Sequence, residues 1–209
     1  NRMVSGGDPD EAPKDVVAEL DRLTNHMRGT LSSIQCAEAQ TLLNQYPRLV
    51  KDLSRTCGKR ACVSSEGGDV LLDRRLLRMM NGPLTHLVRN AVDHGLESPR
   101  ERAITNKPRE GLIQIRIRHQ DHQMIFEVED DGAGIDQDAI DRAAAHHGLH
   151  ELDAAHPGSD DRPLNVIFLP GFSTTQGVTE ISGRGVGLDI VRTAAAQLSG
   201  TVEVQSESG

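Results

Sequence analysis

Apolar residues recur every three or four positions in several segments, which is the spacing of one helical face. The first such segment runs from about Lys14 to Ile34, after a polar, Pro- and Gly-containing entry over residues 1–12. Its apolar stripe suits either a partner helix or packing on its own domain, and the pattern leaves both open. Further helices are predicted over Gln40–Thr56, Asp73–Met80, Gln137–His147 and Val186–Leu198.

Strictly alternating segments predict a β-sheet. Leu112–Arg118 places its three isoleucines on one face and polar residues on the other, and Met124–Glu129 follows after a short turn. The two segments therefore predict a hairpin with one buried face. Three more short strands are predicted over Arg60–Ser64, Val70–Leu72 and Thr201–Ser206.

The run Pro83–Gly95 predicts another helix, because Pro suits a first helical turn and Gly suits a helix end. One face of this helix is apolar, and the other carries His86, Arg89, Asn90, Asp93 and His94. A solvated face usually carries Lys, Glu and Arg, whereas His, Asn and Asp are poorer helix formers. This face is either a row of nitrogen and oxygen ligands or the unusual surface of an ordinary amphipathic helix.

Composition narrows the class of protein. The chain has 209 residues, 36% of them hydrophobic, with no Trp and one Tyr, so its core must be aliphatic. A formal net charge of −8 argues against a general nucleic-acid binder. No segment has the length or apolarity of a membrane span or a secretory signal. The three cysteines lack CxxC spacing and are expected to be reduced thiols of a cytosolic protein. The bounds Asn1 and Gly209 lead us to expect a piece of a longer protein.

An acidic, glycine-containing turn follows the second strand of the predicted hairpin. The sequence Glu129–Asp136 joins that strand to the helix from Gln137. A carboxylate at a strand end can accept a hydrogen bond from an exocyclic amine, and glycine allows a ligand to approach the backbone. The alternative is a plain turn, since Asp and Gly are common in turns.

A second glycine-rich segment, Ser182–Val191, has three glycines at every second position and runs directly into a helix. Backbone N–H groups at a helix N-terminus can bind an anion. The segment is neither a dinucleotide fingerprint, since no strand precedes it, nor a P-loop, since no Gly-Lys-Ser/Thr follows. A flexible hinge is the alternative. Residues 148–183 show little periodicity and predict a functional lid or a disordered segment.

In order and spacing, these motifs resemble the GHKL ATPases, which include gyrase B, heat-shock chaperones, MutL and histidine kinases. Within that superfamily the chain resembles the CheA-type chemotaxis histidine kinases from about Leu31 onward. The segments that carry the resemblance are Leu43–Leu53, Leu72–Arg74, Pro83–Gly95, Phe168–Thr174 and Gly183–Val191.

The resemblance implies a site for ATP and Mg²⁺. His86 and Asn90 would contact Mg²⁺ and the triphosphate, with Asn90 as the main metal ligand, and Asp93 and His94 would lie beside the phosphates. These four residues are the expected catalytic group. Asp130 would receive the adenine amine. The remaining expected ATP-binding residues are Gly132 and Gly134 around the adenine, and Gly171, Gly183, Gly185, Gly187 and Leu188 in the lid and its hinge.

The resemblance also implies an α/β two-layer sandwich, with a mixed, mainly antiparallel sheet covered by helices on one face. Residues 13–36 would be a dimerisation-type helix, and residues 37–209 an ATP-binding catalytic domain with a lid over 148–183. The expected function is transfer of the ATP γ-phosphate to a His on a separate phosphotransfer domain. Alternatives are a nucleotide-binding but inactive scaffold of a signalling array, or another GHKL ATPase.

The expected partners are a histidine phosphotransfer domain, a coupling protein with its chemoreceptor, a response regulator and a second copy through the N-terminal helix. Nucleic acid and direct membrane insertion are not expected, and the location would be cytoplasmic, at membrane receptor arrays. The chain departs from the family pattern in having Gln35–Glu38 where relatives have Arg-Met-Val-Pro, a single dimerisation helix, and only Arg142 where relatives carry lysines near the phosphates.

Other charged and histidine-rich segments have simpler interpretations. His146, His147, His150 and His156 suggest a solvated helix end more than a zinc site, because no Cys or HExxH accompanies them. His26 lacks the acidic neighbour of an acceptor histidine and is expected on the surface. The five basic residues of one region are expected to form a solvated helix face: Arg48, Lys51, Arg55, Lys59 and Arg60.

Overall fold

The computed structural model describes residues 17, 19–20, 22–24, 36–146, 164–169 and 188–207. In chain order, its elements are β1 (Cys36–Glu38), α2 (Gln40–Leu43), α3 (Tyr46–Thr56), β2 (Ala61–Glu66), β3 (Leu71–Asp73), α4 (Arg74–Asn90), the π-helix η1 (Ala91–Gly95), α5 (Pro99–Ile104), β4 (Gly111–Gln120), β5 (Gln123–Asp130), α6 (Gln137–His146), the 3₁₀ helix η3 (Leu164–Phe168) and α7 (Asp189–Gln197).

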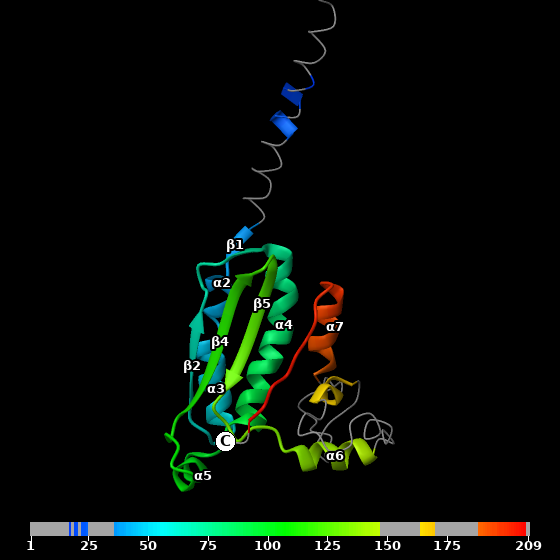
Figure 1. Cartoon of the computed structure of the whole chain (residues 1–209). Helices are drawn as coiled ribbons and strands as arrows, with labels where there is room; N and C mark the ends of the chain where they lie inside the picture. The colour runs from blue at the N-terminus through cyan, green and yellow to red at the C-terminus, as the bar shows by residue number, and fades with distance from the viewer. Residues whose placement is uncertain are drawn as a thin grey trace, which may run out of the picture.

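The main sheet has three strands in the order β2-β4-β5, and α3 and α4 cover one of its faces (Figure 1). The central strand β4 pairs in parallel with β2 and antiparallel with β5. A separate pair is formed by β1 and β3, which run antiparallel. This two-layer, mixed α/β arrangement confirms the expected fold class.

The core lies between the sheet and α3 and α4. Ile113, Ile115 and Ile117 on the inner face of β4 are at most 2% exposed, as the alternating pattern predicts. They belong to one aliphatic cluster with Leu84 and Val88 of α4. Because the chain has almost no large aromatic residues, burial of Leu, Ile and Val supplies most of the hydrophobic stabilisation of this layer contact.

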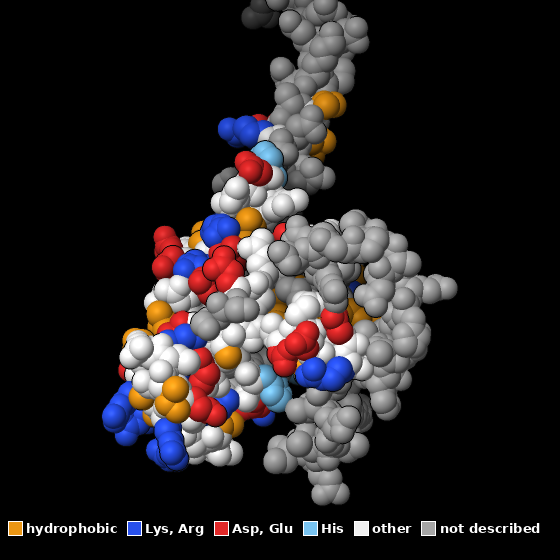
Figure 2. Space-filling view, turned by 60° about the horizontal axis from the view of Figure 1, so that its bottom comes forward, with side chains coloured by type: hydrophobic (Ala, Val, Ile, Leu, Met, Phe, Trp, Pro, Cys, Tyr) orange, Lys and Arg blue, Asp and Glu red, His pale blue; other side chains and the backbone are white. Residues whose placement is uncertain are grey.

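The outer face of the sheet carries paired charges. Arg116 on β4 lies 2.7 Å from Glu129 on β5 and 3.7 Å from Glu66 on β2, so one guanidinium bridges three strands. Arg118 donates a 2.8 Å hydrogen bond to Glu127. Cross-strand pairs of opposite charge stabilise a sheet modestly and keep the face solvated. Figure 2 shows acidic and basic side chains interspersed over the described surface.

The helix expected to start at Pro83 is in fact the second half of α4, which begins after Asp73. The Asp73 side chain accepts a hydrogen bond from the Arg75 backbone N–H, which caps this helix. Pro83 cannot donate to the carbonyl four residues earlier, which normally disfavours a helix interior. Its ring is buried, however, so packing against the core offsets the lost hydrogen bond.

The strand expected over Thr201–Ser206 is absent, because residues 201–207 form no ladder with a neighbouring strand. They follow α7 and are attached by a side chain instead, since Ser206 Oγ accepts a 2.8 Å hydrogen bond from the Ile135 backbone N–H. The other expected strands, and the helices Gln40–Thr56 and Gln137–His147, agree with the structure within a few residues, although Gln40–Thr56 is interrupted between α2 and α3.

The predicted dimerisation helix and lid lie mostly outside the described residues. The helical Val17, Leu20 and Leu23 expose 57%, 57% and 49% of their surface. Cys36, the last residue of the predicted helix, instead begins β1 and pairs with Asp73. Of the lid over 148–183, only residues 164–169 are described. In the described segments, no helix has the length and apolarity needed to cross a membrane.

We expect Leu84→Ala to lower the free energy of unfolding by about 2–5 kcal/mol, because Leu84 is fully buried and its truncation leaves a cavity. Leu71→Ala is the matched control, since Leu71 is 65% exposed and its truncation should change that free energy by no more than about 0.5 kcal/mol. Urea unfolding followed by circular dichroism measures both. Equal midpoints for the two variants would contradict the described core.

Candidate functional site

The site lies at the end of the sandwich where α4 and β5 both finish (Figure 1). The Gly95 carbonyl, at the end of η1, accepts a 3.1 Å hydrogen bond from the Ala133 backbone N–H, in the loop after β5. The helical layer and the sheet layer are therefore joined backbone to backbone. Two of the three motifs singled out in the sequence meet at this contact.

Glycine is required on both sides of this contact. A Cβ on Gly132 would lie 2.1 Å from the Gly95 carbonyl oxygen, and a Cβ on Gly95 would lie 2.7 Å from Asp130 Oδ1. Gly134 has a φ of 77°, and a Cβ there would lie 2.2 Å from the Glu207 carbonyl oxygen. A Cβ at Gly132 or Gly134 would collide with backbone atoms, whereas a Cβ at Gly95 would displace the Asp130 carboxylate. The Asp-Gly turn is thus packed against the end of the helical layer and against the C-terminal segment.

The Asp130 carboxylate lies directly against these glycines. Its Oδ1 accepts a 3.1 Å hydrogen bond from the Gly132 backbone N–H. Although the residue as a whole is exposed, partial burial of its carboxylate raises the pKa of Asp130, and the neighbouring charges of Asp131 and Glu97 act in the same direction. The Gly132 hydrogen bond opposes that rise. The result is a fixed hydrogen-bond acceptor at the end of β5.

His86 lies one turn before the end of α4, near Asp189 at the start of α7. Burial lowers its pKa, the nearby Arg89 lowers it further, and Asp189 at the start of α7 opposes the shift. The imidazole is therefore neutral at physiological pH. Leu188, an expected ATP-binding residue, is the N-cap of α7. The expected glycines Gly171, Gly183, Gly185 and Gly187 lie outside the described residues.

Asn90 is the last residue of α4 and is half-buried. Within the described ranges, no hydrogen bond engages its side-chain amide, so the amide oxygen is available to a ligand. No group of three His, Cys, Asp or Glu in those ranges could hold a metal ion. Mg²⁺ does not need such a group, because it keeps several waters and often takes one or two protein oxygens together with substrate phosphates. An Asn90 amide oxygen fits that chemistry.

The polar face of the predicted helix is divided where α4 changes to a π-helix. The Leu96 backbone N–H donates to the Ala91 carbonyl at 2.8 Å, a spacing of five residues. The wider turn of a π-helix shifts the following side chains around the axis, and such turns are frequent at functional sites. Asp93 consequently points toward α3, where its Oδ1 accepts a 3.0 Å hydrogen bond from Cys57 Sγ, whereas His94 is exposed.

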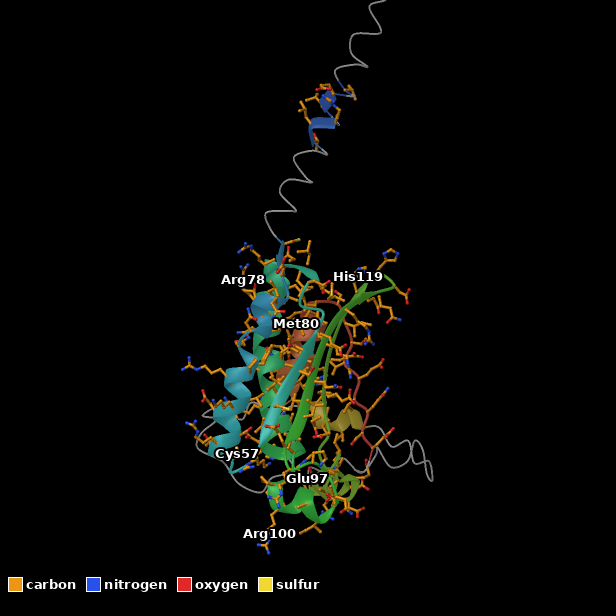
Figure 3. All side chains as sticks on the ribbon, turned by 90° about the vertical axis from the view of Figure 1, so that its left-hand side faces the viewer. Cys57, Arg78, Met80, Glu97, Arg100 and His119 are labelled. Carbon is orange, nitrogen blue, oxygen red and sulfur yellow. The ribbon has the colours of Figure 1, made fainter. Side chains whose placement is uncertain are left out.

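Lys59 holds the end of the same π-helix. Its ammonium donates to the Val92 carbonyl at 2.9 Å and to the Asp93 carbonyl at 2.7 Å. A cation is favourable at a helix C-terminus, where carbonyl groups lack partners. The expectation that Lys59 belongs to a solvated face is therefore wrong. Figure 3 shows Cys57 and Glu97 at this same end of the molecule.

One ion-pair network beside the candidate site was not expected from the sequence. Ser98 and Glu101 form a capping box at the start of α5. The Arg102 side chain in that helix is 0% exposed and pairs with Glu97 and Asp131. The sequence signal that could have indicated such a network is the adjacent acidic pair Asp130-Asp131, because Asp131 pairs with a cation. Nothing local identified Arg102 as that cation.

Comparison with known proteins identifies the family. Residues 81–209 match the family of histidine kinase-, DNA gyrase B- and HSP90-like ATPases. The chain belongs to this family. It is 40% identical over 195 residues to the chemotaxis protein CheA of Halobacterium salinarum, covering 93% of this chain and 29% of that protein. It is 40% identical over 192 residues to the gliding motility regulatory protein of Myxococcus xanthus, covering 88% and 25%.

The chain therefore spans less than a third of the length of these relatives and is similar to one part of each. Among solved structures, the histidine kinase domain of a blue-light-activated histidine kinase from Erythrobacter litoralis aligns with a TM-score of 0.42 at 16% identity. That alignment covers 80% of this chain and 56% of the other.

We expect Gly132→Ala to destabilise the protein by about 1–3 kcal/mol, because the added methyl group overpacks the contact with Gly95. Gly82→Ala is the matched control. Gly82 lies inside α4, and a methyl group added there would have nothing within 4 Å, so Ala should stabilise the protein by about 0.5–1 kcal/mol. Urea unfolding gives both values, and opposite signs are the expected result. A neutral Gly132→Ala variant would contradict the close contact.

Proposed function

We propose that this chain is the ATP-binding catalytic domain of a CheA-like protein histidine kinase. The observation that carries the proposal is the contact between Gly95 and Gly132, which sets the Asp130 acceptor beside the end of the helix that bears His86 and Asn90. Membership of the ATPase family supports ATP as the nucleotide. Relatives named CheA support a histidine as the phosphate acceptor.

The proposed site recognises the two ends of ATP with different elements. Asp130 accepts a hydrogen bond from the adenine amine, and the Gly132 backbone N–H holds the Asp130 carboxylate in place. Asn90 offers its amide oxygen to Mg²⁺, which neutralises triphosphate charge when it is bound. The neutral His86 can hydrogen-bond to the phosphate region or its water without adding charge. Catalysis of phosphoryl transfer rests largely on such positioning.

Partners follow from the proposed activity. A separate phosphotransfer domain would supply the acceptor histidine, and a response regulator would receive the phosphoryl group from it. A coupling protein with its chemoreceptor would control the kinase in the cytoplasm at a receptor array. The exposed apolar residues Val17, Leu20 and Leu23 are the proposed contact with a second copy of the chain.

We expect Asp130→Asn to weaken ADP binding by about ten- to a hundred-fold, because a hydrogen bond to a charged group contributes about 1.5–3 kcal/mol. Asp138→Asn is the matched control, since Asp138 is exposed on α6 and should leave the affinity unchanged. Titration calorimetry measures both. The raised pKa of Asp130 means that its carboxylate is protonated at a higher pH than an ordinary aspartate. As the pH is lowered, the ADP affinity of the unmodified chain should therefore begin to fall at a higher pH than an ordinary aspartate would produce.

Asp130 is the proposed origin of that pH dependence, so the Asp130→Asn variant should lose it over the same range. Equal ADP affinity in the variant and the unmodified chain would remove Asp130 from the site.

We expect Asn90→Ala to abolish Mg²⁺-dependent phosphate transfer while the protein stays folded, because Asn90 lies outside the aliphatic core. The assay incubates labelled ATP and Mg²⁺ with the chain and a phosphotransfer domain from the same parent protein. The product should be acid-labile, as phosphohistidine is, and it should not form without that domain. Nucleotide binding without transfer would favour the inactive scaffold, and a label on His26 would indicate an ordinary histidine kinase.

A further inference from the structure

Arg102 is a buried cation that joins the two segments of the proposed adenine site. Its Nη2 lies 2.7 Å from Asp131 Oδ2, and its Nη1 donates to the Asp131 carbonyl at 3.1 Å. The same Nη1 lies 3.0 Å from Glu97 Oε2, and its Nε donates to the Pro108 carbonyl at 2.6 Å. Glu97 follows η1 closely, and Asp131 adjoins Asp130. One guanidinium therefore connects the exit of the helix with the loop after β5.

Lys107 makes a second connection between the same segments. Its Nζ lies 2.9 Å from Glu97 Oε1 and donates to the Gly132 carbonyl at 2.7 Å. Both oxygens of Glu97 are thus occupied, one by each cation. Although burial acts to raise the pKa of Glu97, its hydrogen bonds and the two cations outweigh burial and lower that pKa, so the carboxylate stays ionised.

Both carboxylate oxygens of Asp131, together with its backbone N–H and carbonyl, are hydrogen-bonded. Its Oδ1 accepts a 2.9 Å hydrogen bond from the Leu112 backbone N–H, and its own N–H donates to the Leu112 carbonyl at 3.1 Å. Because Oδ2 accepts a hydrogen bond from Arg102, the Asp131 side chain cannot rotate without breaking a hydrogen bond. Asp130 is therefore followed by two residues that are hydrogen-bonded to cations. Asp131 is bonded to Arg102, and Gly132 is bonded to Lys107.

We propose that Arg102 and Lys107 are positioning residues that fix the Asp130 carboxylate and thereby set the preference of this site for a purine carrying an exocyclic amine. The inference rests on the proposed nucleotide-binding function. A network needed only for stability could hold this loop in any of several positions. Discrimination between an amine and a carbonyl on the base requires an acceptor in one fixed direction, because the preference comes from the hydrogen bond itself.

The probes are ADP and inosine diphosphate, which differ in that the second presents a carbonyl oxygen in place of the amine. In the unmodified chain, calorimetry should show ADP binding about ten- to a hundred-fold more tightly, the value of one hydrogen bond to a charged group. Arg102→Lys keeps the positive charge but loses the planar fork that reaches Asp131, Glu97 and Pro108 together. Its preference for ADP should fall at least about threefold, chiefly through weaker ADP binding.

Lys107→Met is the second variant, because Lys107 is partly exposed and its loss is better tolerated than a change at the fully buried Arg102. It should also reduce the preference, whereas the matched control Lys51→Met, at an exposed position of α3, should leave it unchanged. Circular dichroism establishes that each variant is folded. If Arg102→Lys does not fold, Lys107→Met decides the question.

Folded variants that bind both nucleotides more weakly but keep the same preference would overturn the inference, because that result reflects stability alone. Double variants that combine Asp130→Asn with Arg102→Lys or with Lys107→Met are a further check. In the Asp130→Asn background, neither second substitution should reduce the remaining preference for ADP. A further reduction there would also overturn the inference. Failure of the unmodified chain to bind ADP would reject the proposed function itself, and the inference with it.

Discussion

The absence of a side chain at Gly95 and Gly132 is the constraint on which the described site depends. With a carbonyl oxygen 2.1 Å from the place of a Cβ, the end of the helical layer and the loop after the sheet can meet only as bare backbone. The hydrogen bond from Ala133 to Gly95 then joins the two layers at one end. Everything that the site offers to a ligand is placed relative to this contact, including the carboxylate of Asp130 and the amide of Asn90.

Ionised groups stabilise this contact from one side, and the aliphatic core stabilises it from the other. The isoleucines on the inner face of β4 belong to one hydrophobic cluster with Leu84 and Val88 of α4. By contrast, Arg102 pairs with Glu97 and Asp131, and Lys107 pairs with Glu97. A buried charge is costly unless it is paired and hydrogen-bonded, and here each of the Arg102 nitrogens has an acceptor. The arrangement gives rigidity at a place where hydrophobic packing would leave no acceptor for a ligand.

The π-helix explains how one helix serves two neighbours. Up to Asn90, α4 presents its polar side chains in a regular row, and His86 lies toward α7. Beyond it the wider turn directs Asp93 toward Cys57, while Lys59 satisfies carbonyls that the turn leaves without partners. The proposed phosphate end of the site is thereby linked to α3, and the proposed adenine end is linked to α5 and β4.

The sequence by itself determined the hairpin, the buried isoleucine face and the family, because these depend on local periodicity and on motifs whose residues are close in the chain. The resemblance to the family indicated Asp130 and its glycines as site residues, which the turn motif alone left open. Tertiary structure decided that α4 continues through Pro83, that residues 201–207 form no strand, and that Lys59 and Arg102 have partners. Those outcomes depend on groups supplied by distant segments, since a buried ring, a free carbonyl or an unpaired carboxylate becomes available only once the layers have packed.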